Sequence, residues 1–131
     1  MSTIFSKIIA GEIPATKVFE DSSHLAFLDI APVAPGHTLL IPKDEYIWLQ
    51  DMPDAAVAEL FTRVTKLMRA MKAGLECDYV QISVVGEDVP HVHVHLIPRW
   101  HNDDLEGWPT SSYESDADKT TIAEQISSQL S

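Results

Sequence analysis

Apolar residues recur along the chain with two periods, and each period predicts one kind of element. Between about Pro53 and Ala73 they return at steps of three and four residues, which is typical of a helix with one apolar face. Pro53 suits the first turn of such a helix, and Gly74 suits its end. The predicted apolar stripe comprises Val57, Leu60, Phe61, Val64, Leu67, Met68, Met71 and Leu75.

Two shorter helices are expected near the ends of the chain. Ser2 or Thr3 is placed to cap the first, and Gly11 is placed to end it. The inner side of this helix would carry Ile4, Phe5, Ile8 and Ile9. The second would lie at about 117–130. Its apolar side would carry Ile122, Ile126 and Leu130.

Five segments rich in β-branched and apolar residues are expected to form strands. They are residues 16–20, 24–30, 37–42, 79–85 and 91–98. Turns containing Gly, Pro, Asp or Ser separate several of them, and the long helix separates the third from the fourth. A long helix inserted between antiparallel strands predicts the α+β fold class.

Composition is that of an ordinary soluble domain. The chain has 131 residues, of which 45% are hydrophobic and 22% are charged, so one domain over residues 1–131 is expected. No apolar run reaches the length of a membrane span, and a membrane partner is not expected. The single cysteine, Cys77, cannot form an internal disulfide. This fits a reducing compartment, and we expect a cytoplasmic location.

The net charge of −11 argues against a nucleic acid partner, because binding to a phosphate backbone requires clustered Lys and Arg. More than half of the excess lies in residues 102–131, which contain seven acidic residues and one basic residue. We interpret this acidic segment as solvated surface. A small anionic ligand remains compatible with the charge, since imidazoles and backbone amides act locally.

Three histidines alternate with apolar residues in the last predicted strand. In a strand, His91, His93 and His95 would share one face. Histidine has a weak preference for strands, and three imidazoles contribute little apolar burial. Near neutral pH an imidazole can act as a nucleophile, a proton carrier or a metal ligand. The pattern therefore predicts phosphate chemistry or a metal site rather than a purely structural strand.

The segment HVHVHLI at 91–97 matches the pattern His-φ-His-φ-His-φ-φ, where φ is apolar, and so resembles the histidine triad (HIT) family. Two further segments, IFSKIIAGEIPATKVFED and LAFLDIAPVAPGHTLLIPK, resemble the compact branch that acts on nucleoside phosphoramidates. The similarity spans about residues 3–99, whereas residues 100–131 diverge. The resemblance implies an antiparallel five-stranded sheet with two main helices, continued across a homodimer.

The resemblance also implies roles for four histidines. His93 would attack phosphorus and form a nucleotidyl-histidine that water then hydrolyses. His95 and His37 would donate hydrogen bonds to the phosphate oxygens, and His91 would orient the other rings.

The remaining parts of a nucleotide would meet other side chains. By resemblance, Asp29 would accept hydrogen bonds from the ribose hydroxyls, although an aspartate that starts a turn would also fit this position. A purine needs an apolar slot, and core packing would favour the same residue types. The residues that match the slot are Ile4, Phe5, Ile8, Phe27 and Ile30.

The chain departs from the family in the loop before the histidines, which is shortened to Gly86–Pro90. Ser83 takes the place of an asparagine that touches phosphate in the family. Asp88 falls where a hydroxyl is common. A carboxylate there would repel a phosphate unless it turned away or bound a divalent cation. No cofactor is expected to be required, and a divalent cation is compatible with the residues.

Two further departures concern metals and the C-terminal segment. Some relatives hold a structural zinc with cysteines, but the matching positions here are Thr3, Ser6 and Glu45, which do not suit such a site. We therefore expect no structural zinc. The C-terminal segment carries three aromatic residues that would cover either the active site or a dimer partner. These are Trp100, Trp108 and Tyr113.

The leading hypothesis is an enzyme that cleaves phosphoramidates or related derivatives of purine nucleoside monophosphates. The hydrolysis of dinucleoside polyphosphates, an activity of another branch, is an alternative. That branch carries a glutamine near the position of Glu87, and its absence weakens this alternative. A nucleotide-binding regulator without turnover and a metal-binding module remain open as well.

Overall fold

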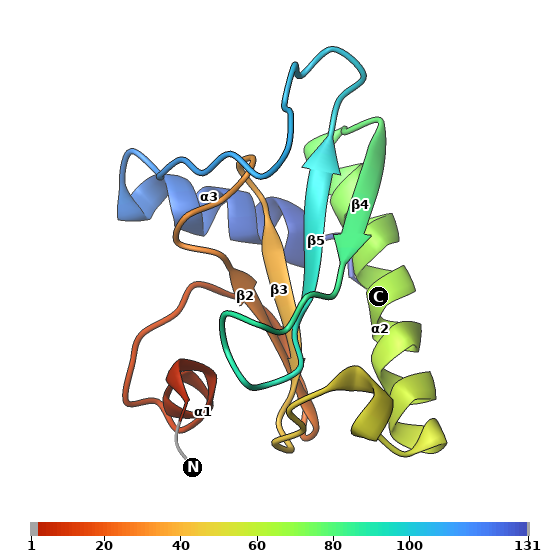
Figure 1. Cartoon of the computed structure of the whole chain (residues 1–131). Coiled ribbons are helices and arrows are strands. Elements are labelled where there is room, and N and C mark those ends of the chain that lie inside the picture. The colour runs from red at the N-terminus through yellow and green to blue at the C-terminus, as the bar shows by residue number, and fades with distance from the viewer. Residues whose placement is uncertain (1–2, 131) are drawn as a thin grey trace.

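The core of the protein is a five-stranded antiparallel sheet with helices on both faces (Figure 1). The computed structural model describes residues 3–130. The strand order is β1-β2-β3-β5-β4, which confirms the expected α+β class. The strands are β1 (Lys17–Glu20), β2 (His24–Leu28), β3 (Thr38–Pro42), β4 (Tyr79–Ser83) and β5 (Val94–Arg99).

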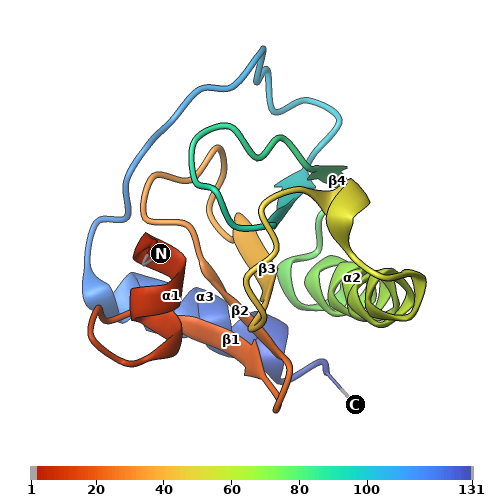
Figure 2. The ribbon, with the colours of Figure 1, turned by 60° about the horizontal axis from the view of Figure 1, so that its bottom comes forward.

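Alternation along the strands divides the apolar residues between two layers. One face packs against α2 (Asp54–Leu75) and α3 (Asp116–Ser127), which lie on the same side of the sheet (Figure 2). The other face packs against the short helix α1 (Ile4–Ile9). A single 3-10 turn, η1 (Leu49–Asp51), precedes α2. Within residues 3–130, no helix is both long and apolar enough to cross a membrane.

Helix α1 is fixed by a capping box between Thr3 and Ser6. The backbone N–H of Ser6 donates to Thr3 Oγ1 at 3.1 Å, and the backbone N–H of Thr3 donates to Ser6 Oγ at 2.7 Å. The prediction of a cap at Thr3 is thus confirmed, while the alternative cap, Ser2, lies outside the described residues. Thr3 and Ser6 thus serve to start a helix.

Helix α2 is longer than predicted, and Gly74 does not end it. The helix continues to Leu75 and ends at Glu76, whose φ of 56° is left-handed. A Cβ atom at position 74 would lie only 2.0 Å from the carbonyl oxygen of Gln125 in α3. The glycine therefore permits the close approach of α3 to α2, which a one-dimensional pattern does not reveal.

Strand β5 begins at Val94 rather than at His91, so the predicted strand 91–98 was wrong at its start. The β3–β5 ladder begins at the pair Leu40 and Val94. Further along β3, Pro42 has no backbone N–H to continue the ladder, and its carbonyl oxygen instead faces the ring of His91. The alternation nevertheless persists: Val92 joins the core on the α2 face, whereas the histidine side chains lie on the opposite face.

Candidate active site

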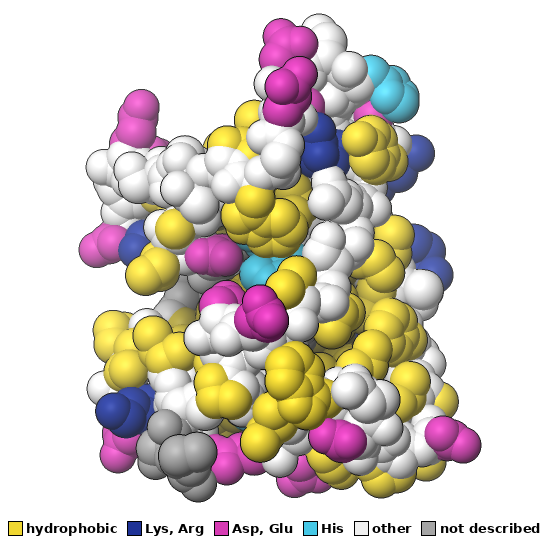
Figure 3. All heavy atoms as spheres, viewed as in Figure 1, with side chains coloured by type: hydrophobic (Ala, Val, Ile, Leu, Met, Phe, Trp, Pro, Cys, Tyr) yellow, Lys and Arg dark blue, Asp and Glu magenta, His cyan; other side chains and the backbone are white. Residues whose placement is uncertain are grey.

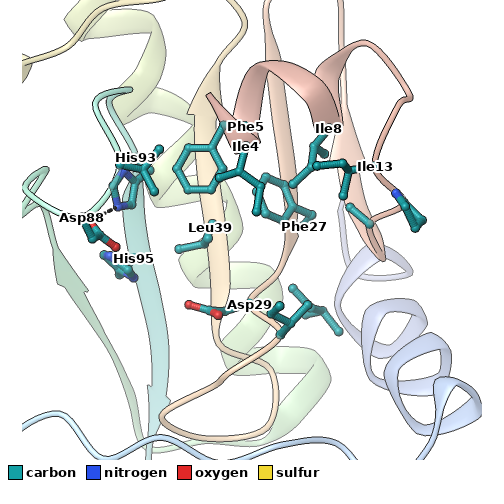
Figure 4. Close-up of a pocket in the computed structure, with 15 residues that line it drawn as sticks. Ile4, Phe5, Ile8, Ile13, Phe27, Asp29, Leu39, Asp88, His93 and His95 are labelled. Atoms are coloured by element: carbon teal, nitrogen blue, oxygen red, sulfur yellow. Dashed lines mark ion pairs between the residues drawn. The ribbon is translucent and has the colours of Figure 1, made fainter. Parts of the chain in front are cut away.

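We call residues 91–95 the histidine segment. A cavity of about 250 Å³ lies between α1 and this segment (Figure 4). Its apolar wall contains all five residues predicted for the purine slot, and its polar end contains Asp29, Asp88, His93 and His95. We call it the nucleotide cavity. The slot residues are Ile4, Phe5, Ile8, Phe27 and Ile30. The sequence thus predicted side chains that the fold brings together from α1, β2 and the histidine segment.

His93 presents one free ring nitrogen at the polar end of this cavity. Its Nδ1–H donates to the backbone carbonyl of His91 at 2.7 Å. In the neutral ring, Nε2 then carries the lone pair. This atom is buried and has no hydrogen-bond partner among residues 3–130. The ring of Phe5 packs edge-on against the imidazole of His93, with 4.9 Å between the ring centroids, and so fixes the orientation of the imidazole.

His37 and His95 form a chain of hydrogen bonds with a fixed direction. The backbone N–H of Val33 donates to His37 Nδ1 at 3.0 Å, so the proton of a neutral His37 resides on Nε2. His37 Nε2 lies 3.0 Å from His95 Nδ1, which must therefore accept. The remaining proton of His95 is then on its Nε2. This leaves His95 with one donor for a ligand.

Burial keeps both of these rings neutral. The pKa of His37 is lowered to about 3, and that of His95 to about 4, chiefly because burial disfavours the charged imidazole. Neighbouring imidazoles, His95 for the first and His93 for the second, lower each pKa further. At neutral pH the donor direction derived from the neutral tautomers therefore applies.

The expectation that His37 itself donates to phosphate does not fit this arrangement. His37 is completely buried, and both of its ring nitrogens are engaged by Val33 and His95. It thus contacts the ligand side of the cavity only through His95, which makes it a positioning residue. The hydrogen-bond donor to a ligand in the cavity would therefore be His95, and His37 lies one side chain behind it.

His91 orients its neighbour through its backbone. Its carbonyl oxygen accepts the proton of His93, while its own ring nitrogen Nε2 donates to the carbonyl of Pro42 at 2.8 Å. Burial lowers the pKa of His91, so the ring is held neutral. The first histidine of the pattern therefore ties the histidine segment to β3, and it does not line the nucleotide cavity.

Asp29 both starts a turn and faces the nucleotide cavity. Its Oδ1 accepts the backbone N–H of Ala31 at 2.9 Å, as expected for an aspartate that starts a turn. Its carboxylate also lines the nucleotide cavity, with Oδ2 at 3.7 Å from His37 Nε2. Burial raises the pKa of this carboxyl, and the nearby Asp88 raises it further. One oxygen is thus held by the backbone while the other remains available to a ligand.

The loop at 86–90 brings Asp88 to the histidines rather than away from them. Asp88 Oδ1 lies 3.2 Å from His93 Nε2, although the geometry is not that of a hydrogen bond. Ligand atoms of Asp88, His93 and His95 lie close enough together to hold a cation, as do those of Asp29, His37 and His95. In the second group the imidazoles already bond to each other. The first group is therefore where a divalent cation would fit.

Ser83 is the only predicted nucleotide-binding residue that does not line the nucleotide cavity. It lies at the end of β4, directly opposite His95 in the β4–β5 ladder. In this ladder, directly opposed residues share a face of the sheet. Ser83 thus lies beside the histidines, one strand away from the cavity.

The C-terminal segment covers the site, a role that the sequence left open. The indole of Trp108 packs edge-on against His95 at 4.8 Å and against His37 at 5.8 Å. Tyr113 accepts the backbone N–H of Gly36 through its hydroxyl at 3.0 Å. Trp100 packs elsewhere, against the small cluster around Ile97. Trp108 is therefore a site residue that pattern analysis could not assign, because nothing in its local sequence points to the histidines.

Comparisons with known proteins agree with this geometry. The family model described as HIT domain matches residues 10–102. A HIT-like protein of Methanocaldococcus jannaschii is 45% identical over 105 residues, which cover 76% of this chain and 81% of that protein. Adenosine 5'-monophosphoramidase hnt1 of Schizosaccharomyces pombe is 36% identical over 136 residues, with 99% of both chains covered.

A solved structure shows the same architecture. The crystal structure of a Zn-bound histidine triad family protein from Mycobacterium smegmatis superposes with a TM-score of 0.85 at 32% identity. The match covers 99% of this chain and 94% of that one. The fold is therefore the one expected from the resemblance.

Proposed function

Since the chain belongs to the HIT domain family and is a hydrolase of that family, we propose that it cleaves phosphoramidates or related derivatives of purine nucleoside monophosphates. The observation that carries the proposal is the free Nε2 of His93, which is buried at the polar end of an apolar cavity. A relative that matches 99% of this chain supports the substrate class, because it is named an adenosine 5'-monophosphoramidase.

In the proposed reaction, the lone pair of His93 Nε2 attacks phosphorus, and the bond from phosphorus to the leaving nitrogen breaks. The electron pair of that bond goes to the nitrogen, which takes up a proton from water and departs as an amine. Hydrolysis of the resulting nucleotidyl-histidine by water restores the free ring. Throughout, the Nε2–H of His95 donates to the phosphoryl group.

The other groups hold the nucleophile and the substrate. The carbonyl of His91 keeps the proton of His93 on Nδ1, so that Nε2 remains available as a nucleophile. His37 donates to His95 Nδ1 and so keeps the proton of His95 on Nε2, the ring nitrogen that does not face His37. The purine would fill the slot formed by α1 and β2, and the ribose would meet Asp29. Each of these side chains acts by position, which is the main requirement of phosphoryl transfer.

A panel of substrates tests this proposal. Adenosine 5'-phosphoramidate should be hydrolysed with a kcat/KM at least about tenfold above that of diadenosine polyphosphates, because the acidic loop at 86–90 disfavours an anionic leaving group. The release of adenosine monophosphate is the measurement. Binding of adenosine monophosphate without any turnover would instead support a regulator, and metal binding without nucleotide binding would support a metal module.

A second experiment concerns the ribose. We expect Asp29→Ala to weaken the binding of adenosine monophosphate by about 1–3 kcal/mol, the usual loss for a charge-assisted hydrogen bond. Binding of the 2'-deoxy ligand should weaken less, which calorimetry on both ligands will measure. Asp29→Asn is the matched variant, since it can still accept the N–H of Ala31. Equal losses for both ligands would reduce Asp29 to a turn residue.

We further propose that the protein is a homodimer. Strand β4 is an edge of the sheet, and exposed apolar side chains lie on it and beside it. The most exposed are Ile47, Trp48, Tyr79, Ile82 and Val85. On α2, Phe61 and Met68 are only partly buried. These surfaces fit a dimer in which two sheets join at β4.

Light scattering at micromolar concentration is expected to give twice the monomer mass of 14.6 kDa. A stable interface of this kind would bury on the order of 2,000 Å². Ile82→Asp should shift the mass toward that of the monomer, because it places a charge at the edge of β4. The control, Thr120→Asp, changes an exposed residue of α3, away from β4 and from the face of α2 that carries Phe61 and Met68. A monomer mass for the wild type would contradict the proposal.

A further inference from the structure

A second cavity adjoins the nucleotide cavity and shares Asp88 and His95 with it. Its volume is about 330 Å³, and its other lining residues are Val85, Glu87 and Trp108. Figure 3 shows a histidine side chain at the bottom of a hollow bordered by apolar and acidic side chains. With the nucleoside in the first cavity, the group on the other side of phosphorus would enter the second. We call it the leaving-group cavity.

The leaving-group cavity is acidic and aromatic. Glu87 and Asp88 are exposed carboxylates, and none of the five lining residues is Lys or Arg. Asp88 Oδ1 lies 3.2 Å from the buried Nε2 of His93, which has no hydrogen-bond partner among residues 3–130. The indole of Trp108 is 42% exposed. Carboxylates attract a cation, and an indole face adds a cation–π contact.

We propose that this cavity selects leaving groups that carry a positive charge, such as an alkylamine with a distant ammonium. The inference rests on the proposed function and names the substrates that the site prefers. The proposal also explains why a carboxylate, Asp88, lies beside the nucleophile. A carboxylate beside the nucleophile repels an anionic phosphoryl group, and a cation on the same substrate offsets that repulsion.

The reaction itself is unchanged by this selection. His93 Nε2 forms a bond to phosphorus, the bond to the leaving nitrogen breaks, and that nitrogen takes up a proton. The product amine is protonated at neutral pH and so gains a second positive charge. Glu87 and Asp88 are thus matched to the product as well as to the substrate.

Three adenosine 5'-phosphoramidates test the proposal, with leaving amines of equal chain length that end in an ammonium, a methyl or a carboxylate. We expect kcat/KM for the ammonium substrate to exceed that for the methyl substrate about tenfold, and the carboxylate substrate to be the poorest. This preference should shrink as salt is added, because the charges are exposed. EDTA is included, since Asp88, His93 and His95 could also hold a divalent cation.

The ratio between two substrates separates charge selection from catalysis. Glu87→Gln should lower the ratio of kcat/KM for the ammonium substrate to kcat/KM for the methyl substrate, whatever it does to the overall rate. Asp88→Asn should lower the same ratio whatever it does to the overall rate. The double variant should abolish the preference. Asp51→Asn is the control, because it removes an exposed carboxylate that lines neither cavity.

Each outcome has a distinct meaning. Equal hydrolysis of all three substrates by the wild type would overturn the charge selection but leave the proposed function intact. A preference that survives in the double variant would overturn the assignment to Glu87 and Asp88. A failure to hydrolyse any of the three would count against the proposed function itself.

Discussion

Replacing His93 with alanine is expected to reduce the turnover of adenosine 5'-phosphoramidate by about 10³-fold or more. The physical reason is the loss of the only ring nitrogen in the triad that is both buried in the nucleotide cavity and free of a hydrogen bond. Binding of adenosine monophosphate should change little, because the apolar slot and Asp29 remain. Single-turnover kinetics and calorimetry measure the two effects separately.

A matched control is His101→Ala, which removes an exposed histidine just after β5. It should leave both turnover and binding unchanged. Rapid acid-free quenching of the wild type, followed by mass spectrometry, should show a protein with one added nucleotidyl group. The adduct should be absent from His93→Ala. Near-normal turnover of this variant would rule out His93 as the nucleophile.

The second large effect is expected on stability. Gly74→Ala should lower the free energy of unfolding by roughly 2–4 kcal/mol, because the new Cβ would lie 2.0 Å from the carbonyl oxygen of Gln125. A backbone oxygen cannot rotate away as a flexible side chain can, so α3 would have to shift from α2. Urea unfolding of both proteins will measure the difference.

The sign of the change is the decisive result. In an exposed helix without a close neighbour, Gly→Ala stabilises by about 1 kcal/mol. An increase in stability on Gly74→Ala would therefore show that the contact between α2 and α3 is looser than described. Ala73→Gly provides the reverse control at an exposed position of the same helix, with an expected loss of about 1 kcal/mol.

The sequence predicted the elements well where local patterns decide them. The periodic stripe of α2, the cap at Thr3 and the five strands all depend on residues near each other in the chain. Gly74 was misinterpreted because its reason is Gln125, some fifty residues later. The start of β5 was placed too early because the end of the ladder depends on Pro42 in another strand.

For the candidate site as well, some features could be predicted from the sequence and others depend on tertiary contacts. The resemblance supplied residues such as His93 and Asp29, and the fold brings them to one cavity. It could not supply the direction of the hydrogen bonds, which is set by the backbone N–H of Val33. Trp108 was equally out of reach, since it contacts the histidines only because a long, irregular segment returns across the sheet. Tertiary contacts of this kind leave no trace in local composition.

The buried imidazoles that make the site also limit the acidity that the fold tolerates. An unfolded chain binds protons at His37 and His95 with an ordinary pKa near 6.5, whereas the folded protein does so only near pH 3 and 4. Stability is therefore complete above about pH 6.5 and decreases as the pH falls toward those values. At pH 5 the loss is on the order of 2 kcal/mol for each of the two residues. The proton affinity of the unfolded chain thus sets an acid limit on this fold, and that limit originates in the active site rather than in the apolar core.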